Sequence, residues 1–108
     1  MERRRSRRVS VMAEIDYELD GITMSKRIAD ISDGGVFIDT PVPAEVGTTF
    51  SFRFSLEGVA IEAKGRVAYS QPYIGMGIEF TSLSADARKM IVTYVDRSVA
   101  ELEPVGAI

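Results

Sequence analysis

Residues 50–63 read FSFRFSLEGVAIEA, and this stretch decides the fold. Apolar residues alternate with polar ones on both sides of Glu57-Gly58, and this period of two is typical of strands with one buried face. The Glu57-Gly58 pair supplies the chemistry of a tight turn. The stretch therefore predicts an antiparallel hairpin whose strands cover residues 50–56 and 59–69, with the phenylalanines facing the core.

The same alternation extends outward in both directions along the chain. Further strands are expected over residues 9–17, 22–31, 36–38 and 74–80. In the second of these, Ile22, Met24 and Ile28 fall on one face, although Lys26 interrupts it. Gly65 falls on the inward face of its strand, which predicts a bulge or a sharp bend there.

The period changes after Ser84. Apolar residues then recur at helical spacing, and Ser84 is placed to cap the first turn. The sequence thus predicts a mainly β fold, a six-stranded antiparallel barrel with a C-terminal α-helix. Its organisation is a flexible arm over 1–8, a single domain over 9–102 and a tail over 103–108.

The composition excludes several classes of site. The chain has no cysteine and no histidine, so it lacks thiolate metal ligands, the commonest general base and the commonest metal ligand. We therefore expect neither an enzyme nor a metal site, and no cofactor. No apolar run is long enough to span a membrane, and the basic N-terminus has no apolar segment of a secretory signal behind it, so we expect a cytoplasmic protein.

The charges are unevenly distributed. The net charge is −3, yet residues 3–8 contain five arginines, so the rest of the chain is strongly acidic. Guanidinium groups grip phosphate bidentately or stack on bases, and the arm therefore predicts a partner with dense negative charge. The alternative is a solvated terminus that only aids solubility.

A second segment, residues 30–35, reads DISDGG. Asp30 and Ser32 are two apart at a strand end, so both side chains point to one face. A carboxylate can accept two hydrogen bonds from the Watson–Crick edge of guanine, and a hydroxyl can donate to phosphate. Gly34 and Gly35 allow close approach of a ligand and positive φ. The alternative is an ordinary loop of turn-forming residues.

Together these two segments resemble the PilZ domain family. Arg4-x-x-x-Arg8 followed by Asp30-x-Ser32-x-x-Gly35 is similar to that family's RxxxR and D/NxSxxG pattern. Residues 75–80, GMGIEF, before the helix also look like the end of a PilZ domain. The resemblance covers almost the whole chain and implies the barrel fold and binding of the bacterial second messenger cyclic di-GMP.

The resemblance also implies a role for each motif residue. Arg4 and Arg8 would clamp phosphates and stack on or read guanine, and Asp30 would bind a guanine edge. Ser32 would contact phosphate or orient its neighbours, and Gly35 would permit the tight turn. Arg3 precedes the first motif arginine, and an arginine there favours a stacked pair of ligand molecules. Arg3 and Arg7 also satisfy RxxxR, so the register of the first motif is open, with Arg4 and Arg8 preferred.

The leading hypothesis is a cyclic di-GMP receptor or adaptor module that orders its arginine arm on binding. It would act through an unidentified protein partner in motility or exopolysaccharide regulation. The alternative is a PilZ-fold interaction module that does not depend on cyclic di-GMP. A nucleic-acid-binding barrel is disfavoured because the acidic body would repel a polyanion beyond the arm.

Overall fold

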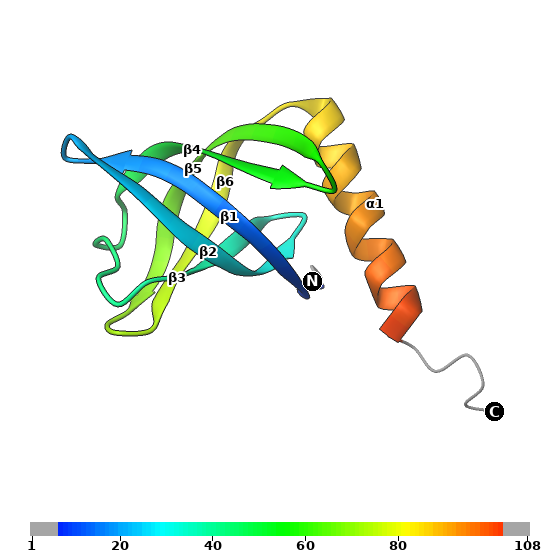
Figure 1. The fold of residues 1–108 in the computed structure, drawn as a ribbon, viewed down its shortest axis with the longest axis horizontal. Coiled ribbons are helices and arrows are strands. Elements are labelled where there is room, and N and C mark those ends of the chain that lie inside the picture. Colours follow the sequence, from blue (N-terminus) through cyan, green and yellow to red (C-terminus); the bar gives the residue numbers. More distant parts are fainter. Residues whose placement is uncertain (1–6, 103–108) are drawn as a thin grey trace.

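The chain folds as a closed antiparallel barrel of six strands followed by one helix (Figure 1). A computed structural model describes residues 7–102. The strands follow one another around the barrel in the order β1-β2-β3-β6-β5-β4. The elements are β1 (Val9–Leu19), β2 (Ile22–Ser32), β3 (Gly35–Asp39), β4 (Thr49–Leu56), β5 (Val59–Gln71), β6 (Gly75–Leu83) and α1 (Ala85–Leu102). The predicted mainly β barrel with a C-terminal helix is confirmed.

Two hairpins close through turns of the same backbone geometry. Asp20 and Gly21 join β1 to β2 with φ of 53° and 79°. Glu57 and Gly58 join β4 to β5 with φ of 51° and 83°. Positive φ at both central positions defines the type I′ turn, whose twist matches that of the flanking strands. The turn residues therefore specify both hairpins locally, as predicted for the second of them.

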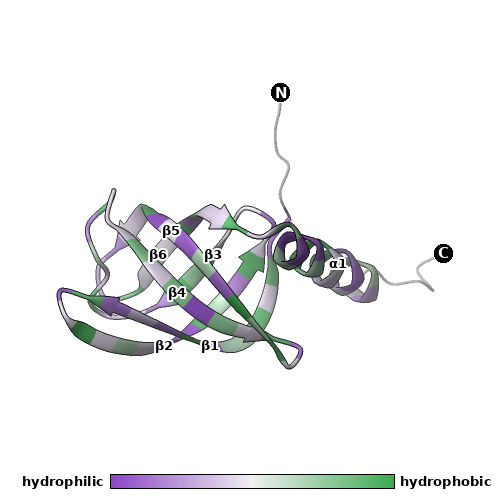
Figure 2. Ribbon diagram, turned by 90° about the horizontal axis from the view of Figure 1, so that it is seen from above, coloured by the Kyte–Doolittle hydropathy of each residue, from purple (hydrophilic) through white to green (hydrophobic). Residues whose placement is uncertain are grey.

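The core fills the barrel from the inward-facing residues of every strand. Figure 2 shows the alternation as bands of hydrophobic and hydrophilic residues along the strands. Phe50, Phe52 and Phe54 are 8%, 4% and 2% exposed, and the rings of Phe52 and Phe80 lie 6.0 Å apart. Burying such a side chain contributes about 1.5–3 kcal/mol. Gly65 also faces inward, and the β5–β6 register shifts beside it, as the glycine predicts.

The helix α1 covers one end of the barrel. The Ser84 hydroxyl accepts a hydrogen bond from the backbone N–H of Ala87 at 3.0 Å, which confirms the predicted N-cap. Ala87, Ile91 and Val95 are buried against the core. The Tyr94 hydroxyl donates to a backbone carbonyl of β1 at 3.4 Å. One stripe of α1 is thereby fixed on the barrel.

The barrel closes along a short seam between β1 and β4. Its residue pairs are Ile15 with Phe54, Asp16 with Arg53, and Tyr17 with Phe52. The Tyr17 ring lies 5.1 Å from that of Phe50. Burial raises the pKa of the Tyr17 hydroxyl above its usual value of 10.0. The closing strand pair therefore depends on aromatic packing as well as on its few ladder bonds.

One expectation about an apolar face and one about the start of a strand need correction. On β2 only Ile28 of the expected face is fully buried, while Met24 is half-buried and Ile22 is 62% exposed. Ile22 follows the β1–β2 turn, which extends past the body of the barrel (Figure 1). Ile74 precedes β6 in the turn after Tyr73 and is 60% exposed. Both isoleucines lie at hairpin ends, beyond the reach of the core.

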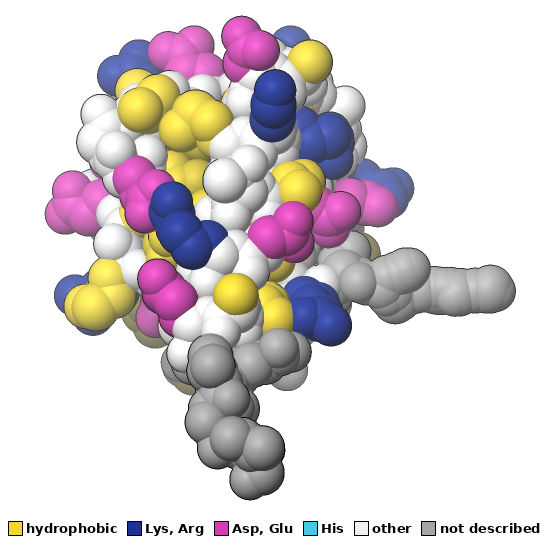
Figure 3. Space-filling view, turned by 90° about the vertical axis from the view of Figure 1, so that its right-hand side faces the viewer, with side chains coloured by type: hydrophobic (Ala, Val, Ile, Leu, Met, Phe, Trp, Pro, Cys, Tyr) yellow, Lys and Arg dark blue, Asp and Glu magenta, His cyan; other side chains and the backbone are white. Residues whose placement is uncertain are grey.

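The outer side of α1 carries charges of both signs. Figure 3 views the end of the molecule where α1 lies and shows basic and acidic side chains interspersed with hydrophobic ones. No helix in the described part of the chain has the length and apolar character needed to cross a membrane.

Candidate functional site

The strand β2 changes phase before it reaches the second motif. In its pairing with β3 the register shifts between Ile28 and Asp30, which is a β-bulge. Ile28 and Ile31 are both fully buried although they are three residues apart. Because successive side chains point to opposite faces, Asp30 and Ser32 flank Ile31 on the outer side of the barrel. The bulge thus turns both motif side chains away from the core.

Arg8 lies immediately before β1 and reaches two neighbours across the barrel surface. Its Nε lies 3.4 Å from Oδ1 of Asp30, and its Nη2 donates to the hydroxyl of Tyr69 at 3.2 Å. The side chains of Arg8 and Asp30 are 41% and 33% exposed. Such half-exposed pairs contribute little to stability, so this one leaves both groups able to exchange partners with a ligand.

The carboxylate of Asp30 has unused capacity. Its Oδ1 is buried, and no group among the described residues makes a hydrogen bond to it, although the Arg8 guanidinium lies nearby. The ion pair with Arg8 offsets part of the cost of burying this oxygen without a hydrogen bond. A ligand that displaces the Arg8 guanidinium can donate an N–H to it.

The turn after β2 is held by hydrogen bonds on both sides of Gly34. The Ser32 hydroxyl oxygen accepts the N–H of Gly34 at 3.1 Å, and Ser32 is only 5% exposed. The carbonyl of Gly34 accepts the N–H of Phe80, in β6, at 2.9 Å. Since the Ser32 oxygen is used as an acceptor here, its own O–H remains available as a donor.

Gly35 is needed for a different reason from the expected one. Neither Gly34 nor Gly35 has positive φ, so the turn does not use the left-handed conformation that the two glycines allow. A Cβ on Gly35 would lie 1.9 Å from the carbonyl oxygen of Ile78. Gly35 pairs with Glu79 in the β3–β6 ladder, and its missing side chain lets the two strands approach.

A hollow of about 160 Å³ lies beside these residues. It is lined by Arg8, Ser32, Gly34, Gly35, Ala68, Tyr69, Gly77, Ile78 and Glu79. The structure therefore brings Arg8, the motif residues Ser32 and Gly35, and Gly34 between them to one depression, and Asp30 contacts Arg8 beside it.

Tyr69 is a site residue whose place the sequence did not reveal. In the structure its ring stacks with Phe37 at 6.1 Å and 29°, and the side chain is 42% exposed. A Cβ on Gly77 would lie 2.2 Å from the ring, so the Tyr69 ring lies against the bare backbone of β6. Gly77, which follows Gly75 by two residues, is the feature of the sequence that could have indicated this close contact.

The other predicted site residues are placed as follows. Arg3 and Arg4 lie outside the described residues. Arg7 is exposed, and Arg8 is the arginine that contacts Asp30. This contact supports Arg8 as the second arginine of the first motif.

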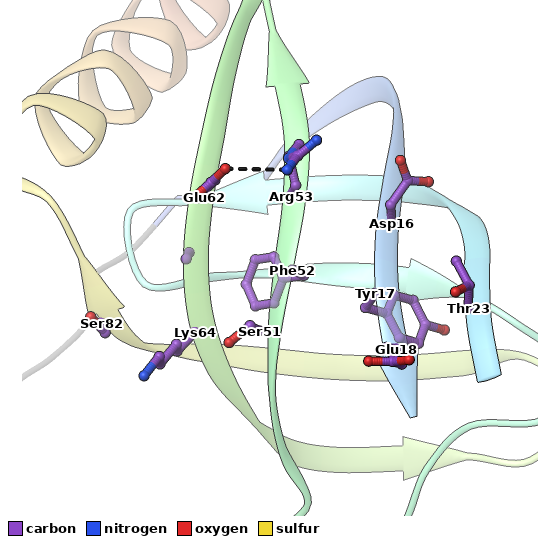
Figure 4. A pocket seen from close by; sticks show the side chains of 11 residues that line it. Asp16, Tyr17, Glu18, Thr23, Ser51, Phe52, Arg53, Glu62, Lys64 and Ser82 are labelled. Carbon is purple, nitrogen blue, oxygen red and sulfur yellow. Dashed lines mark ion pairs between the residues drawn. The ribbon is translucent and has the colours of Figure 1, made fainter. Parts of the chain in front are cut away.

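A larger hollow lies elsewhere, along β1, β4 and β5 (Figure 4). Its volume is about 510 Å³, and its wall carries Asp16, Glu18, Arg53, Glu62 and Lys64. Arg53 and Glu62 form an ion pair at 3.3 Å. None of the described motif residues lines it, and its three acidic side chains outnumber its two basic ones, which does not favour an anionic ligand, so we assign the site to the smaller hollow.

The described residues contain no group of three or more acidic side chains placed to hold a metal ion. The chemistry of the smaller hollow is instead that of a binding site. It combines a guanidinium, a hydroxyl donor and exposed glycine backbone, and the carboxylate of Asp30 lies beside it in contact with Arg8.

These features define a small closed barrel with a binding depression where the N-terminal segment meets the β2–β3 turn. The PilZ domain model matches residues 2–97, and the chain belongs to the PilZ domain family. The members of this family are ligand-binding receptor modules. No curated protein matches the sequence.

Solved structures share the fold at low sequence identity. The Bacillus subtilis inhibitor of motility (MotI/DgrA) superposes with a TM-score of 0.81 at 15% identity, over 96% of this chain and 55% of that one. The PilZ domain of YcgR from Escherichia coli, solved with c-di-GMP, superposes with a TM-score of 0.73 at 18% identity, over 92% of this chain and 93% of that one. PlzA of Borreliella burgdorferi, in complex with c-di-GMP, superposes with a TM-score of 0.61 at 18% identity, over 86% of this chain and 41% of that one. The chain thus spans about half of the first neighbour and nearly all of the YcgR domain.

Proposed function

We propose that this PilZ domain is a receptor module for cyclic di-GMP. The observation that carries the proposal is the meeting of Arg8 and Asp30 at 3.4 Å beside the Ser32–Gly35 turn. Once released from Arg8, the carboxylate of Asp30 suits the N1–H and N2 amine of guanine. Guanidinium groups suit its O6/N7 edge and the phosphates.

The remaining motif residues complete this site. Arg4 would join Arg8 on the phosphates, and the Ser32 hydroxyl would donate to a phosphate oxygen. Arg3 would favour a stacked pair of ligand molecules. The YcgR domain and PlzA were both solved with c-di-GMP, which supports the same ligand here.

We propose further that the arginine arm becomes ordered over the bound ligand and changes the surface shown to a protein partner. The module performs no catalysis and works in the cytoplasm. Because the Bacillus subtilis neighbour is an inhibitor of motility, regulation of motility is the first process to examine, and exopolysaccharide synthesis the second.

The test is calorimetric titration of cyclic di-GMP into the wild type and an Arg4→Ala/Arg8→Ala variant. Each charge-assisted contact contributes about 1.5–3 kcal/mol, so the double variant should bind at least about 100-fold more weakly. An Arg53→Ala/Lys64→Ala variant removes two cations from the larger hollow and should bind normally. The heats would also give the stoichiometry, and two ligands per chain would support the stacked pair.

Absence of binding to the wild type, checked by an optical method that does not depend on heat, would refute the receptor proposal. The interaction module that does not depend on cyclic di-GMP would then be the better description.

A further inference from the structure

A helix residue holds the motif turn. Arg88, in the first turns of α1, donates from Nη1 to the backbone carbonyl of Asp33 at 3.0 Å, across 55 residues of sequence. Ala87 and Ile91 on either side of it are 7% and 0% exposed, so this part of α1 is fixed on the core. The guanidinium of Arg88 therefore joins the turn to an anchored element.

This turn differs from the two other tight hairpin turns. Asp33 and Gly34 connect β2 to β3, but neither has positive φ, unlike the central residues of the β1–β2 and β4–β5 turns. The turn is therefore neither type I′ nor type II′, and it lacks the twist that matches two-residue hairpins best. Contacts from α1 and β6 supplement the backbone of this turn.

Arg88 and Ser32 act on opposite ends of one peptide group. The carbonyl of Asp33 and the N–H of Gly34 belong to the same planar unit. Arg88 binds its carbonyl at 3.0 Å, and the Ser32 hydroxyl oxygen accepts its N–H at 3.1 Å. Fixing the plane of this peptide fixes the direction of the Gly34 N–H, and hence the position of the Ser32 hydroxyl.

We propose that Arg88 is a positioning residue for the binding site. Through the Asp33–Gly34 peptide it holds the Ser32 hydroxyl and the glycine backbone in the geometry that receives a ligand, and so connects the site to α1. The inference rests on the proposed function for the identity of the ligand. Arg88 itself is exposed and need not touch the ligand.

The experiment compares Arg88→Met, which keeps the aliphatic stem without the donors, with Arg88→Lys, which restores a donor. Arg97→Met is the matched control, because Arg97 lies on the same helix and pairs with Glu57 at 2.5 Å in the β4–β5 turn. Cyclic di-GMP affinity should fall about fivefold to tenfold in Arg88→Met, recover in part in Arg88→Lys and stay unchanged in Arg97→Met.

A double-variant cycle separates positioning from general loosening of the fold. If Arg88 acts through Ser32, then Ser32→Ala should cost much less affinity in the Arg88→Met background than in the wild type. Wild-type affinity in Arg88→Met, or fully additive losses, would overturn the inference.

A ligand-free measurement keeps the inference distinct from the proposed function. Hydrogen exchange of the Gly34 amide should be faster in Arg88→Met than in the wild type and in Arg97→Met. If the wild type binds no cyclic di-GMP, the proposed function fails, and the Gly34 amide alone decides whether Arg88 holds the turn. Unchanged exchange there would refute that role.

Discussion

Gly35 shows how a motif residue can be required for packing between strands. A Cβ at this position would overlap the backbone of Ile78, and the neighbouring strands cannot move apart without opening the β3–β6 ladder. The motif glycine therefore supports the site by keeping the β2–β3 turn close to β6.

We expect Gly35→Ala to lower the free energy of unfolding by about 3 kcal/mol, because the added methyl group overpacks a site with no room. Gly21→Ala is the control, since that position has φ of 79° and nothing within 4 Å. In Gly21→Ala the free energy of unfolding should fall by only about 1 kcal/mol, the cost of the left-handed conformation alone. Urea unfolding of both variants measures the difference, and equal losses would contradict the steric explanation.

A change at Tyr69 should have a small effect on the affinity for the ligand. Tyr69→Phe removes the acceptor that holds the Arg8 guanidinium at 3.2 Å and keeps the ring on Gly77. We expect cyclic di-GMP affinity to fall about threefold, because one exposed hydrogen bond is lost. Tyr73→Phe, at a position 85% exposed, should change nothing. Calorimetry compares the two, and an unaltered affinity in Tyr69→Phe would show that Arg8 needs no such support.

At the scale of single residues, the sequence predicted part of the site and not all of it. Asp30 and Ser32 were expected on one face, and they share the outer face because a bulge shifts the phase of β2 after Ile28. Periodicity cannot locate such a bulge, since it is set by pairing with a distant strand. The contacts of Tyr69 with Arg8 and of Arg88 with Asp33 join residues 61 and 55 positions apart, so no local pattern contains them.

At the scale of elements, the hairpins and the seam between β1 and β4 depend on different information. The hairpins follow from turn residues and alternation, which are local. The seam joins strands far apart in sequence, and Tyr17 lies at its end with a pKa raised by burial. Its register could not be predicted from the pattern of either strand.

The raised pKa of Tyr17 gives a pH dependence with a definite sign. The folded protein ionises this phenol less readily than the unfolded chain, whose pKa is near 10.0. The stabilising contribution is therefore complete below pH 10 and is lost as the pH rises from there through the folded pKa. Urea unfolding between about pH 8 and pH 11 should show a steeper alkaline loss in the wild type than in Tyr17→Phe. An equal alkaline loss of the free energy of unfolding in the wild type and in Tyr17→Phe would contradict this assignment.

At the scale of the whole molecule, an acidic chain carries a cluster of arginines near its N-terminus. The positions of the charged residues in the sequence show this asymmetry directly, and the alternation of apolar and polar residues predicted the barrel. The family model and the solved neighbours bear out the fold, since both span nearly the whole chain. Which face of the molecule contacts a partner depends on long-range surface shape, which a single sequence does not contain.

The charge asymmetry predicts salt-dependent binding. Raising the salt from about 0.1 M to about 1 M shortens the screening length from about 10 Å to about 3 Å. Cyclic di-GMP binding should weaken about tenfold over this range, mainly through slower association. An uncharged solute at equal osmolality is the control. If the association rate constants of cyclic di-GMP measured by stopped flow do not change with salt, the arginines do not attract the ligand.

The pairing of β3 with β6, and of β1 with β4, also has a kinetic consequence. The other strand pairs are hairpins of neighbouring strands, and these two are the long-range steps that close the ring. Long-range pairings carry the greater entropy of loop closure and form slowly. The hollow takes its residues from the segment just before β1, the β2–β3 turn, β5 and β6, so it is complete only when β3 has paired with β6. After dilution from denaturant, recovery of ligand binding should therefore follow this long-range pairing and lag behind the formation of the hairpins.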